Sequence, residues 1–166
     1  MAYGTYRFQD PATGAPTAEW WQRAVATIID GAIFLIPTWI VVYVILLHAV
    51  TTTHYIGGYA YQTRSTGLLY LFDVLFLLGY LAYYTLLNGG EKGQTVGKMV
   101  MGIATRDESG QGPIGYGRAA GRFGVIWLLS LPCGIPLLID YLSPLWDPRR
   151  QAWHDKAVRS LVINVR

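Results

Sequence analysis

The apolar residues of this chain are gathered into three long stretches separated by short polar segments. The first stretch covers residues 24–50 and contains two ionisable residues, Asp30 and His48. The second covers residues 67–87, with Asp73 as its one ionisable residue. About 20 consecutive apolar residues are enough to cross the hydrocarbon layer of a bilayer. The pattern therefore predicts two full transmembrane helices.

The third stretch, residues 119–146, is interrupted in its middle by Pro132 and Pro136. Proline inside a helix removes a backbone hydrogen bond and clashes with the preceding turn. We therefore expect this segment to be a broken helix. It would either cross the membrane with a kink or form a re-entrant hairpin that returns to the side from which it came.

The distribution of basic residues favours the hairpin. Arg7 and Arg23 precede the first span, Arg64 alone separates the first two spans, and most other basic residues follow the second span or end the chain. Lys and Arg are enriched in cytoplasmic segments, which places the amino terminus in the cytoplasm. A hairpin at residues 119–146 would keep the basic carboxyl-terminal tail there as well.

Two short β-branched segments lie outside the apolar stretches, at residues 102–106 and 161–165. Such segments are typical of strands, and we expect them to pair on the cytoplasmic side. Residues 1–18 are polar and contain glycine and proline, which predicts a mobile tail. The fold class is thus an all-α membrane protein with a small strand pair, and residues 19–166 form one membrane domain.

Composition agrees with a membrane protein and excludes several other classes. Apolar residues make up 52% of the chain and charged residues 14%, and the mean hydropathy is +0.30, whereas soluble domains carry roughly 25% charged residues. The net charge of +3 is explained by cytoplasmic segments without invoking nucleic acid. The single cysteine, Cys133, excludes an internal disulfide and a cysteine cage for zinc. No nucleophile, metal shell or cofactor fingerprint is recognisable, so we expect no enzyme, no metal and no cofactor.

Carboxylates inside apolar spans are costly unless protein surrounds them, so Asp30 and Asp73 are candidates for ion or ligand binding. Asp30 lies nearly two helical turns after Arg23 and shares its face. Arg122 has a comparable depth and an arm that could reach Asp30, which predicts an Asp30–Arg122 ion pair. Asp73 lies in a span of opposite direction, so the two aspartates are not expected to share one site.

Several motifs together resemble the RDD family of bacterial membrane proteins, over about residues 19–166. They are Trp20-Trp21-Gln22-Arg23-Ala24 with Ile29-Asp30, Gly93-Gln94-Thr95-Val96-Gly97-Lys98 with Gly102-Ile103, Arg118-Ala119 with Arg122, and Arg150-Gln151-Ala152-Trp153-His154-Asp155-Lys156. The resemblance implies that Arg23 and Asp30 are the arginine and first aspartate after which the family is named. The second aspartate would be Asp155, with Asp73 as the alternative. The resemblance also implies a location in the bacterial cell membrane and suggests transport, with cation/proton exchange proposed for some members.

The segment Gly93–Lys98 differs from a phosphate-binding loop, because its glycines are one residue too close and Met99 replaces the hydroxyl residue. We interpret it as a turn and a short helix at the membrane surface. In this interpretation Gln94 and Thr95 cap backbone groups, Gly97 lies within the helix, and Lys98 meets lipid phosphate. A cytoplasmic cluster of Arg23, Asp155 and Gln94 is expected, with His154 beside it.

Two functional hypotheses remain from the sequence. In the first, the chain is a small carrier for a small solute or a cation, with sodium/proton exchange as one form of it; Asp30 binds the ion, and Arg23 or Arg122 tunes it. A single copy offers few helices to enclose a polar path, so a carrier would be a homo-oligomer. In the second, the chain is a non-transporting adaptor whose basic cytoplasmic face binds anionic lipid or a partner protein.

Overall fold

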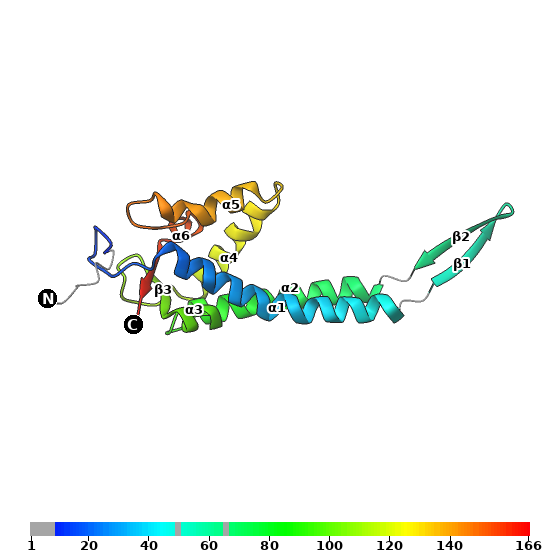
Figure 1. Cartoon of the computed structure of the whole chain (residues 1–166), viewed down its shortest axis with the longest axis horizontal. Helices are drawn as coiled ribbons and strands as arrows, with labels where there is room; N and C mark the ends of the chain where they lie inside the picture. Colours follow the sequence, from blue (N-terminus) through cyan, green and yellow to red (C-terminus); the bar gives the residue numbers. More distant parts are fainter. Residues whose placement is uncertain (1–8, 49–50, 65–66) are drawn as a thin grey trace. The chain divides into compact units, whose positions relative to one another are not determined.

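The computed structural model describes residues 9–48, 51–64 and 67–166 and is mostly helical (Figure 1). In chain order, its elements are α1 Trp20–His48, β1 Thr51–Ile56, β2 Tyr59–Arg64, α2 Gly67–Gly89, α3 Val96–Met101, β3 Ile103–Asp107, α4 Tyr116–Ser130, α5 Ile135–Leu142, the 3₁₀ turn η1 Ser143–Leu145, α6 Trp153–Ala157 and β4 Ser160–Asn164. Two compact units result. One is formed by the chain up to Asp30 together with Leu81–Arg166, and the other by Gly31–Tyr80.

The two long apolar helices are confirmed. Both α1 and α2 are long and apolar enough to cross a membrane, and 6% or fewer of the residues in their most apolar windows are buried. Side chains such as Trp39 and Leu75 are 70% and 59% exposed, which water would penalise and lipid would not. In the Gly31–Tyr80 unit, Phe34 packs edge-on against Tyr80 with ring centroids 5.0 Å apart. The exposed surfaces of both helices are therefore strongly apolar.

A β-hairpin between the first two helices was not predicted. Strands β1 and β2 pair in antiparallel register from Thr51↔Arg64 to Ile56↔Tyr59. Gly57 and Gly58 connect them, both with positive φ (+59° and +82°). A two-residue Gly-Gly connection with positive φ is a favoured hairpin turn. The threonine-rich segment followed by this turn was therefore a signal that the sequence analysis missed.

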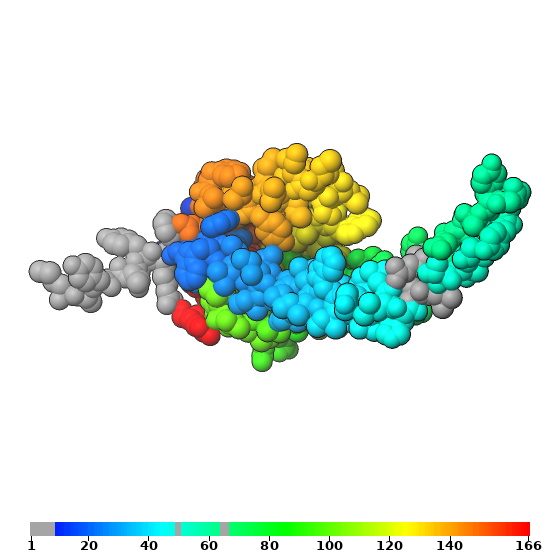
Figure 2. Space-filling view, turned by 45° about the vertical axis from the view of Figure 1, so that its right-hand side comes forward, coloured from blue at the N-terminus to red at the C-terminus, as the bar shows by residue number. Residues whose placement is uncertain are grey.

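The third apolar segment is broken where its prolines predict a break. Helix α4 ends at Ser130, and α5 begins at Ile135 with Pro136 in its first turn. Cys133 and Gly134 in the connection both have positive φ. The chain reverses here and α5 lies back along α4, so that the two form one surface, yellow to orange in Figures 1 and 2. Its exposed side chains include Leu131, Ile135 and Leu138.

The predicted strand pair is confirmed, with strands shifted by one residue from the expected ranges. Strands β3 and β4 pair in antiparallel register from Ile103↔Asn164 to Asp107↔Ser160. Their inner side chains are buried together with apolar groups that precede or belong to α1, forming the cluster Ala18, Ala26, Ile103 and Val162. This cluster holds the first turns of α1 against the strand pair.

Residues 1–18 were predicted to be a mobile tail, but residues 9–18 make defined contacts with the rest of the protein. Residues 1–8 lie outside the described residues. Thr17 forms a β-bridge with Ile163, and the amide of Ala18 donates to the carbonyl of Val162 at 2.9 Å. Asp10 is buried and accepts a hydrogen bond from Arg149 Nε at 2.7 Å. The tail prediction was based on polarity, glycine and proline, and it overlooked that an extended segment can add to a strand edge.

Candidate functional site

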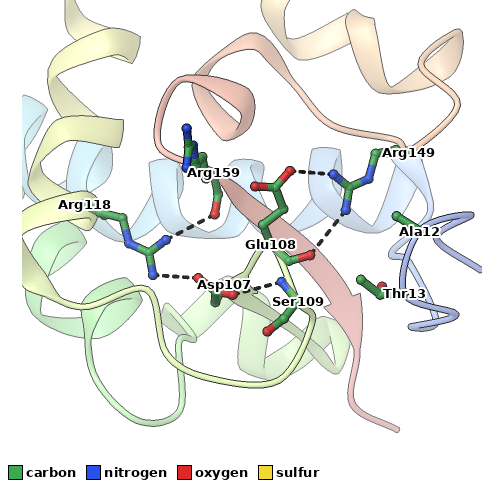
Figure 3. A pocket seen from close by; sticks show the side chains of 8 residues that line it. All are labelled: Ala12, Thr13, Asp107, Glu108, Ser109, Arg118, Arg149 and Arg159. Atoms are coloured by element: carbon green, nitrogen blue, oxygen red, sulfur yellow. Dashed lines mark hydrogen bonds and ion pairs between the residues drawn. The ribbon is translucent and has the colours of Figure 1, made fainter.

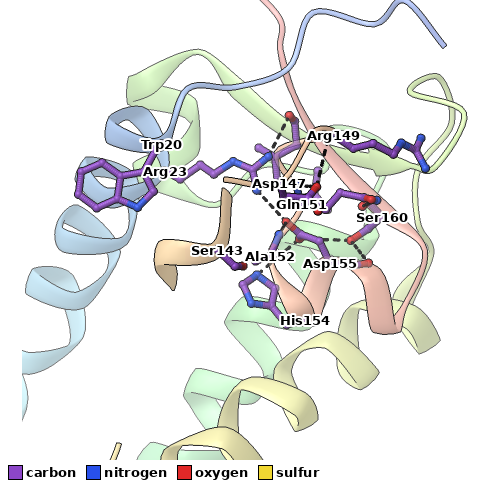
Figure 4. A network of polar contacts seen from close by, with 12 residues as sticks. Trp20, Arg23, Ser143, Asp147, Arg149, Gln151, Ala152, His154, Asp155 and Ser160 are labelled. Atoms are coloured by element: carbon purple, nitrogen blue, oxygen red, sulfur yellow. Dashed lines mark hydrogen bonds and ion pairs between the residues drawn. The ribbon is translucent and has the colours of Figure 1, made fainter. Parts of the chain in front are cut away.

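A buried carboxylate, Asp155, lies between two guanidinium groups. Arg23 Nη1 donates to Asp155 Oδ2 at 2.7 Å, and Arg122 Nε donates to Oδ1 at 2.9 Å. The carboxylate is fully buried, and the arginine side chains are 12% and 4% exposed. Figure 4 shows Arg23 reaching from α1 toward Asp155 at the start of α6. The predicted contact between Arg23 and Asp155 is confirmed.

The electrostatics of Asp155 follow from this double pairing. Burial by itself raises the pKa of a carboxyl group, but here the charges of Arg122 and Arg23 act against burial and lower the pKa of Asp155 far below its usual range. The backbone amide of Ala152 also donates to Oδ2 at 3.1 Å. Asp155 is therefore a permanent anion that joins α1, α4 and the start of α6.

Arg122 connects this carboxylate to a second one that the sequence did not reveal. Its Nη2 donates to His154 Nε2 at 2.8 Å. An arginine can only donate, so Nε2 is unprotonated and Nδ1 carries the proton, which it donates to Asp140 Oδ2. Burial and the neighbouring Arg122 charge lower the pKa of His154, in agreement with a neutral ring. Asp140 also accepts from the backbone amide of His154 at 2.9 Å, which fixes α5 to α6.

Asp30 forms a separate site at the start of α3. Its Oδ1 accepts from Tyr83 Oη and from the amide of Gly97, both at 2.7 Å, and its Oδ2 accepts from Thr95 Oγ1 at 2.5 Å. The residue is 8% exposed. All three donors are electrically neutral, so a buried carboxylate is held without a cation among the residues that the structure describes.

The predicted Asp30–Arg122 ion pair is therefore wrong. Arg122 is bound to Asp155 and His154. The oxygens of Asp30 accept instead from Tyr83 on α2 and from Thr95 and Gly97 at the start of α3. The sequence placed α3 at the membrane surface and gave no indication that it packs directly on α1. Because of that packing, neutral donors contact Asp30 in place of an arginine.

Glycine makes the close approach of α3 possible. A Cβ atom on Gly97 would lie 2.1 Å from the carbonyl oxygen of Ala26 on α1. A Cβ on Gly93, which has φ +57°, would lie 2.1 Å from the carbonyl oxygen of Thr105. These two positions admit no side chain, which explains both glycines of the Gly-Gln-Thr-Val-Gly-Lys segment.

The polar residues of that segment have different roles from those predicted. Gln94 Nε2 donates to the carbonyl of Ile103 at 2.9 Å instead of joining Arg23 and Asp155. Thr95 stands at the N-cap of α3, but its hydroxyl binds Asp30 and makes no capping hydrogen bond. The short helix itself is confirmed, at Val96–Met101. The segment therefore packs against α1 and β3 instead of forming a free turn at the surface.

Lys98 also differs from the prediction, because it is buried and does not face lipid phosphate. Its Nζ donates to Asn88 Oδ1 and, at 2.5 Å, to Thr105 Oγ1. Burial and the positive charge of Arg122 lower the pKa of Lys98 well below its ordinary value. The sequence analysis missed Asn88 and Thr105. Thr105 had been predicted only as part of a strand.

Asp73 is outside these networks. It lies on α2 within the Gly31–Tyr80 unit, its side chain is exposed, and it has no hydrogen-bond or ion-pair partner within the described part of the chain. Among the described residues, no group of three or more His, Cys, Asp or Glu side chains is arranged to hold a metal ion. Of the two aspartates singled out in the apolar spans, Asp30 is the enclosed one.

A polar pocket of about 520 Å³ opens on the surface beside the turn that follows β3 (Figure 3). Arg118 Nη2 donates to Asp107 Oδ2 at 2.9 Å, and Arg149 Nη1 donates to Glu108 Oε1 at 2.7 Å. Arg159 also lines this pocket, and its side chain forms no ion pair with a described residue. The pocket therefore presents one guanidinium group available to an anion.

Comparison with known proteins identifies the family. The model of the RDD family matches residues 17–159. An uncharacterized protein, YxaI, from Bacillus subtilis (strain 168) is 29% identical over 151 residues, which cover 88% of this chain and 96% of that relative. A proline-rich antigen homolog from Mycobacterium tuberculosis (strain CDC 1551 / Oshkosh) is 25% identical over 154 residues, covering 88% of this chain and 62% of that relative.

No solved structure matches the chain significantly. The family match covers α1, α3, α4 and α6, and with them Arg23, Asp30, Arg122 and Asp155. Together with the two long apolar helices, it indicates a membrane-associated protein. The chain belongs to the RDD family.

Proposed function

We propose that this chain is a multi-pass protein of the bacterial cell membrane that transports a small cation, sodium or a proton, with Asp30 as the binding carboxylate. The observation that carries the proposal is the set of partners around Asp30. A buried carboxylate normally has a cationic partner, and here Tyr83, Thr95 and the amide of Gly97 take that place.

The surrounding oxygens suit a hard cation. Hydroxyl groups both donate and accept, so Thr95 and Tyr83 can turn their hydrogens away and offer lone pairs beside the two oxygens of Asp30. Oxygen ligands of this kind suit hard cations, and a proton would bind the carboxylate directly. Asp155 is unsuited to the same role because two arginines already neutralise it.

The proposal includes a topology and an assembly. Most basic residues lie outside Gly31–Tyr80, so the positive-inside rule favours a cytoplasmic amino terminus. A reversal of the chain between α4 and α5 is compatible with a re-entrant hairpin that leaves the carboxyl terminus on the same side. A single copy offers only two helices long and apolar enough to span a membrane among the described residues, so transport would use a homo-oligomer.

Purified protein in proteoliposomes tests the proposal. We expect uptake of radioactive sodium, or dissipation of an imposed pH gradient, by the wild type and its loss in Asp30→Asn. Asp73→Asn is the matched control, because it removes an exposed carboxylate of the same charge, and it should retain flux. Thr95→Ser keeps the hydroxyl and should also retain flux, whereas Thr95→Val should reduce it.

Folding must be followed in parallel, because Asp30 also holds α3. Size-exclusion elution and tryptophan fluorescence of Asp30→Asn should match those of the wild type. Absence of cation or proton flux in the wild type would end the proposal, as would full flux in a folded Asp30→Asn protein.

A second candidate function is suggested by Arg159 in the surface pocket. A non-transporting adaptor would use this guanidinium to bind anionic lipid headgroups, each basic residue contributing about 1 kcal/mol near an anionic surface. Binding of short-chain phosphatidylserine to the micellar protein, compared with Arg159→Gln, tests this function. Equal binding by both proteins would exclude it.

A further inference from the structure

Lys98 is a buried cation-forming side chain that the proposed transport site leaves unexplained. The residue is 9% exposed and lies on α3, one position after the glycine that binds Asp30. It forms no ion pair with a carboxylate of any described residue. Its recorded hydrogen-bond partners, Asn88 Oδ1 and Thr105 Oγ1, are both neutral oxygens of fully buried residues.

The number of hydrogen bonds that Nζ donates equals the number of N–H groups on a neutral amine. Thr105 Oγ1 donates its own hydrogen to Asn88 Oδ1 at 3.1 Å, so it receives the hydrogen bond from Lys98. The amine therefore donates twice, once to each oxygen. A neutral amine has two N–H groups, whereas an ammonium group has three. The third proton of an ammonium group would have no acceptor among these partners.

The neighbouring charges also disfavour an ammonium group. Arg122 Nη1 donates to the same Thr105 oxygen at 3.4 Å, and both cations approach the ring of Tyr84, at 6.0 Å for Lys98 and 5.9 Å for Arg122. Two positive groups would thus share one hydroxyl and one ring. Arginine stays protonated under all ordinary conditions, so the lysine is the group that can lose its charge.

The remaining charged groups that act on Lys98 come from other elements. Arg23 on α1 adds repulsion, whereas Asp30 on α1 and Asp155 on α6 add attraction. Two arginines already neutralise Asp155, whereas the donors to Asp30 are neutral and leave its negative charge in place. Burial is nevertheless the largest influence at Lys98 and outweighs the attraction of Asp30.

We propose that Lys98 is kept as a neutral amine near neutral pH and serves as a buried proton-binding group, with Asn88 and Thr105 as its fixed acceptors. This site goes beyond the proposed cation site at Asp30 and does not depend on it. On acidification the amine takes up a proton and adds a third positive charge beside Arg122 and Arg23. The new N–H needs an acceptor, so proton uptake should loosen the contact between α3 and its neighbours.

Nuclear magnetic resonance of lysine gives a direct test, because the chain contains three lysines, Lys92, Lys98 and Lys156. Lys92 and Lys156 are exposed, so Lys92→Arg and Lys156→Arg leave one buried lysine without changing it. With lysine labelled at Cε and Nζ, the micellar protein is titrated by pH and each signal is followed.

We expect the Lys98 signal to titrate with a midpoint well below the ordinary lysine value of 10.5, because burial disfavours the charged form. A midpoint at or above 10.5 would overturn the proposal, because it would mean that an ammonium group is stable here or is paired with an anion. The measurement involves no transport. A failed flux experiment at Asp30 and a failed titration at Lys98 are therefore separate results.

Stability gives a second and independent readout. A lysine with a lowered folded-state pKa makes the folded protein lose stability as pH falls from about 10.5 toward that pKa, because the unfolded chain binds the proton more readily. Lys98→Met removes the titrating amine and should flatten the pH dependence of the free energy of unfolding in that range. Lys92→Met should leave this pH dependence unchanged. Identical pH dependence in wild type and a folded Lys98→Met protein would contradict the proposal.

Discussion

Replacement of Gly97 by alanine is the sharpest test of the contact between α3 and α1. Alanine is the better helix former by at most about 1 kcal/mol, so local propensity alone predicts that the substitution stabilises the protein. The structure predicts the opposite sign. A Cβ atom at this position would lie 2.1 Å from the carbonyl oxygen of Ala26 and 3.0 Å from its Cα.

The expected loss can be worked out from this geometry. Contacts of a Cβ atom under 3.0 Å are essentially never found, so α3 must move away from α1 by about 1 Å. Such a shift costs about 1–3 kcal/mol as overpacking. It also weakens the hydrogen bonds that Asp30 accepts from the Gly97 amide and from Thr95, at about 1–3 kcal/mol for a buried acceptor. After subtraction of the helix gain, Gly97→Ala should destabilise the protein by about 1–5 kcal/mol.

Reversible unfolding in mixed micelles, followed by tryptophan fluorescence, measures this change. The matched control is Gly124→Ala on α4, where a Cβ atom would meet nothing within 4 Å. It replaces the same residue type inside a helix, so it should be neutral or stabilising by up to about 1 kcal/mol. Gly97→Ala with the stability of Gly124→Ala would refute the close approach of α3 and α1, and with it the described surroundings of Asp30.

Two further predictions concern carboxylates. Asp155→Asn should destabilise the same protein by about 3–5 kcal/mol, because it leaves two buried guanidinium groups without their counter-ion, whereas Asp73→Asn should change stability by less than about 0.5 kcal/mol in the same unfolding assay. The pKa of Asp10 is lowered to about 2, mainly by its hydrogen bonds from Arg149. Its stabilisation should therefore be present above about pH 4 and lost as the pH falls toward 2, and an acid titration of Asp10→Asn should lack this loss.

Features set by the local pattern of residues could be predicted from the sequence. Length and apolarity predicted α1 and α2, and the proline positions predicted the break between α4 and α5. Two β-branched runs predicted β3 and β4 and their pairing. Each of these features depends on neighbours along the chain or on a simple periodicity, and such information is contained in the sequence itself.

Features that depend on tertiary packing were predicted less well. Lys98 was assigned to lipid phosphate because a basic residue in a short turn-rich segment usually faces the surface. Its burial follows from Gly93 and Gly97, which allow the segment to approach Thr105 and Ala26. The sequence analysis placed these glycines in a turn and a short helix, but a sequence does not reveal which backbone they will approach.

The predicted partner of Asp30 was wrong for the same reason, namely tertiary packing. The predicted partner of Asp155 was confirmed, and the position of Asp155 in its helix explains the difference. Both predictions matched a carboxylate with an arginine of suitable reach. Asp155 is the third residue of α6 and receives the amide of Ala152, so its side chain is held at the helix start where Arg23 and Arg122 can both approach. Asp30 is in the interior of a long helix, and whatever packs on that face determines its partners.

Asp30 and Asp155 therefore have opposite electrostatic roles in one fold. Asp155 compensates two arginines, so removal of its charge leaves an excess of positive charge within the protein. Asp30 is held by neutral donors, so removal of its charge by a proton or its compensation by a cation leaves no arginine unpaired. A carboxylate can exchange its positive partner reversibly only if the fold does not depend on a fixed one. By that criterion Asp30, and not Asp155, is the position at which an ion could come and go.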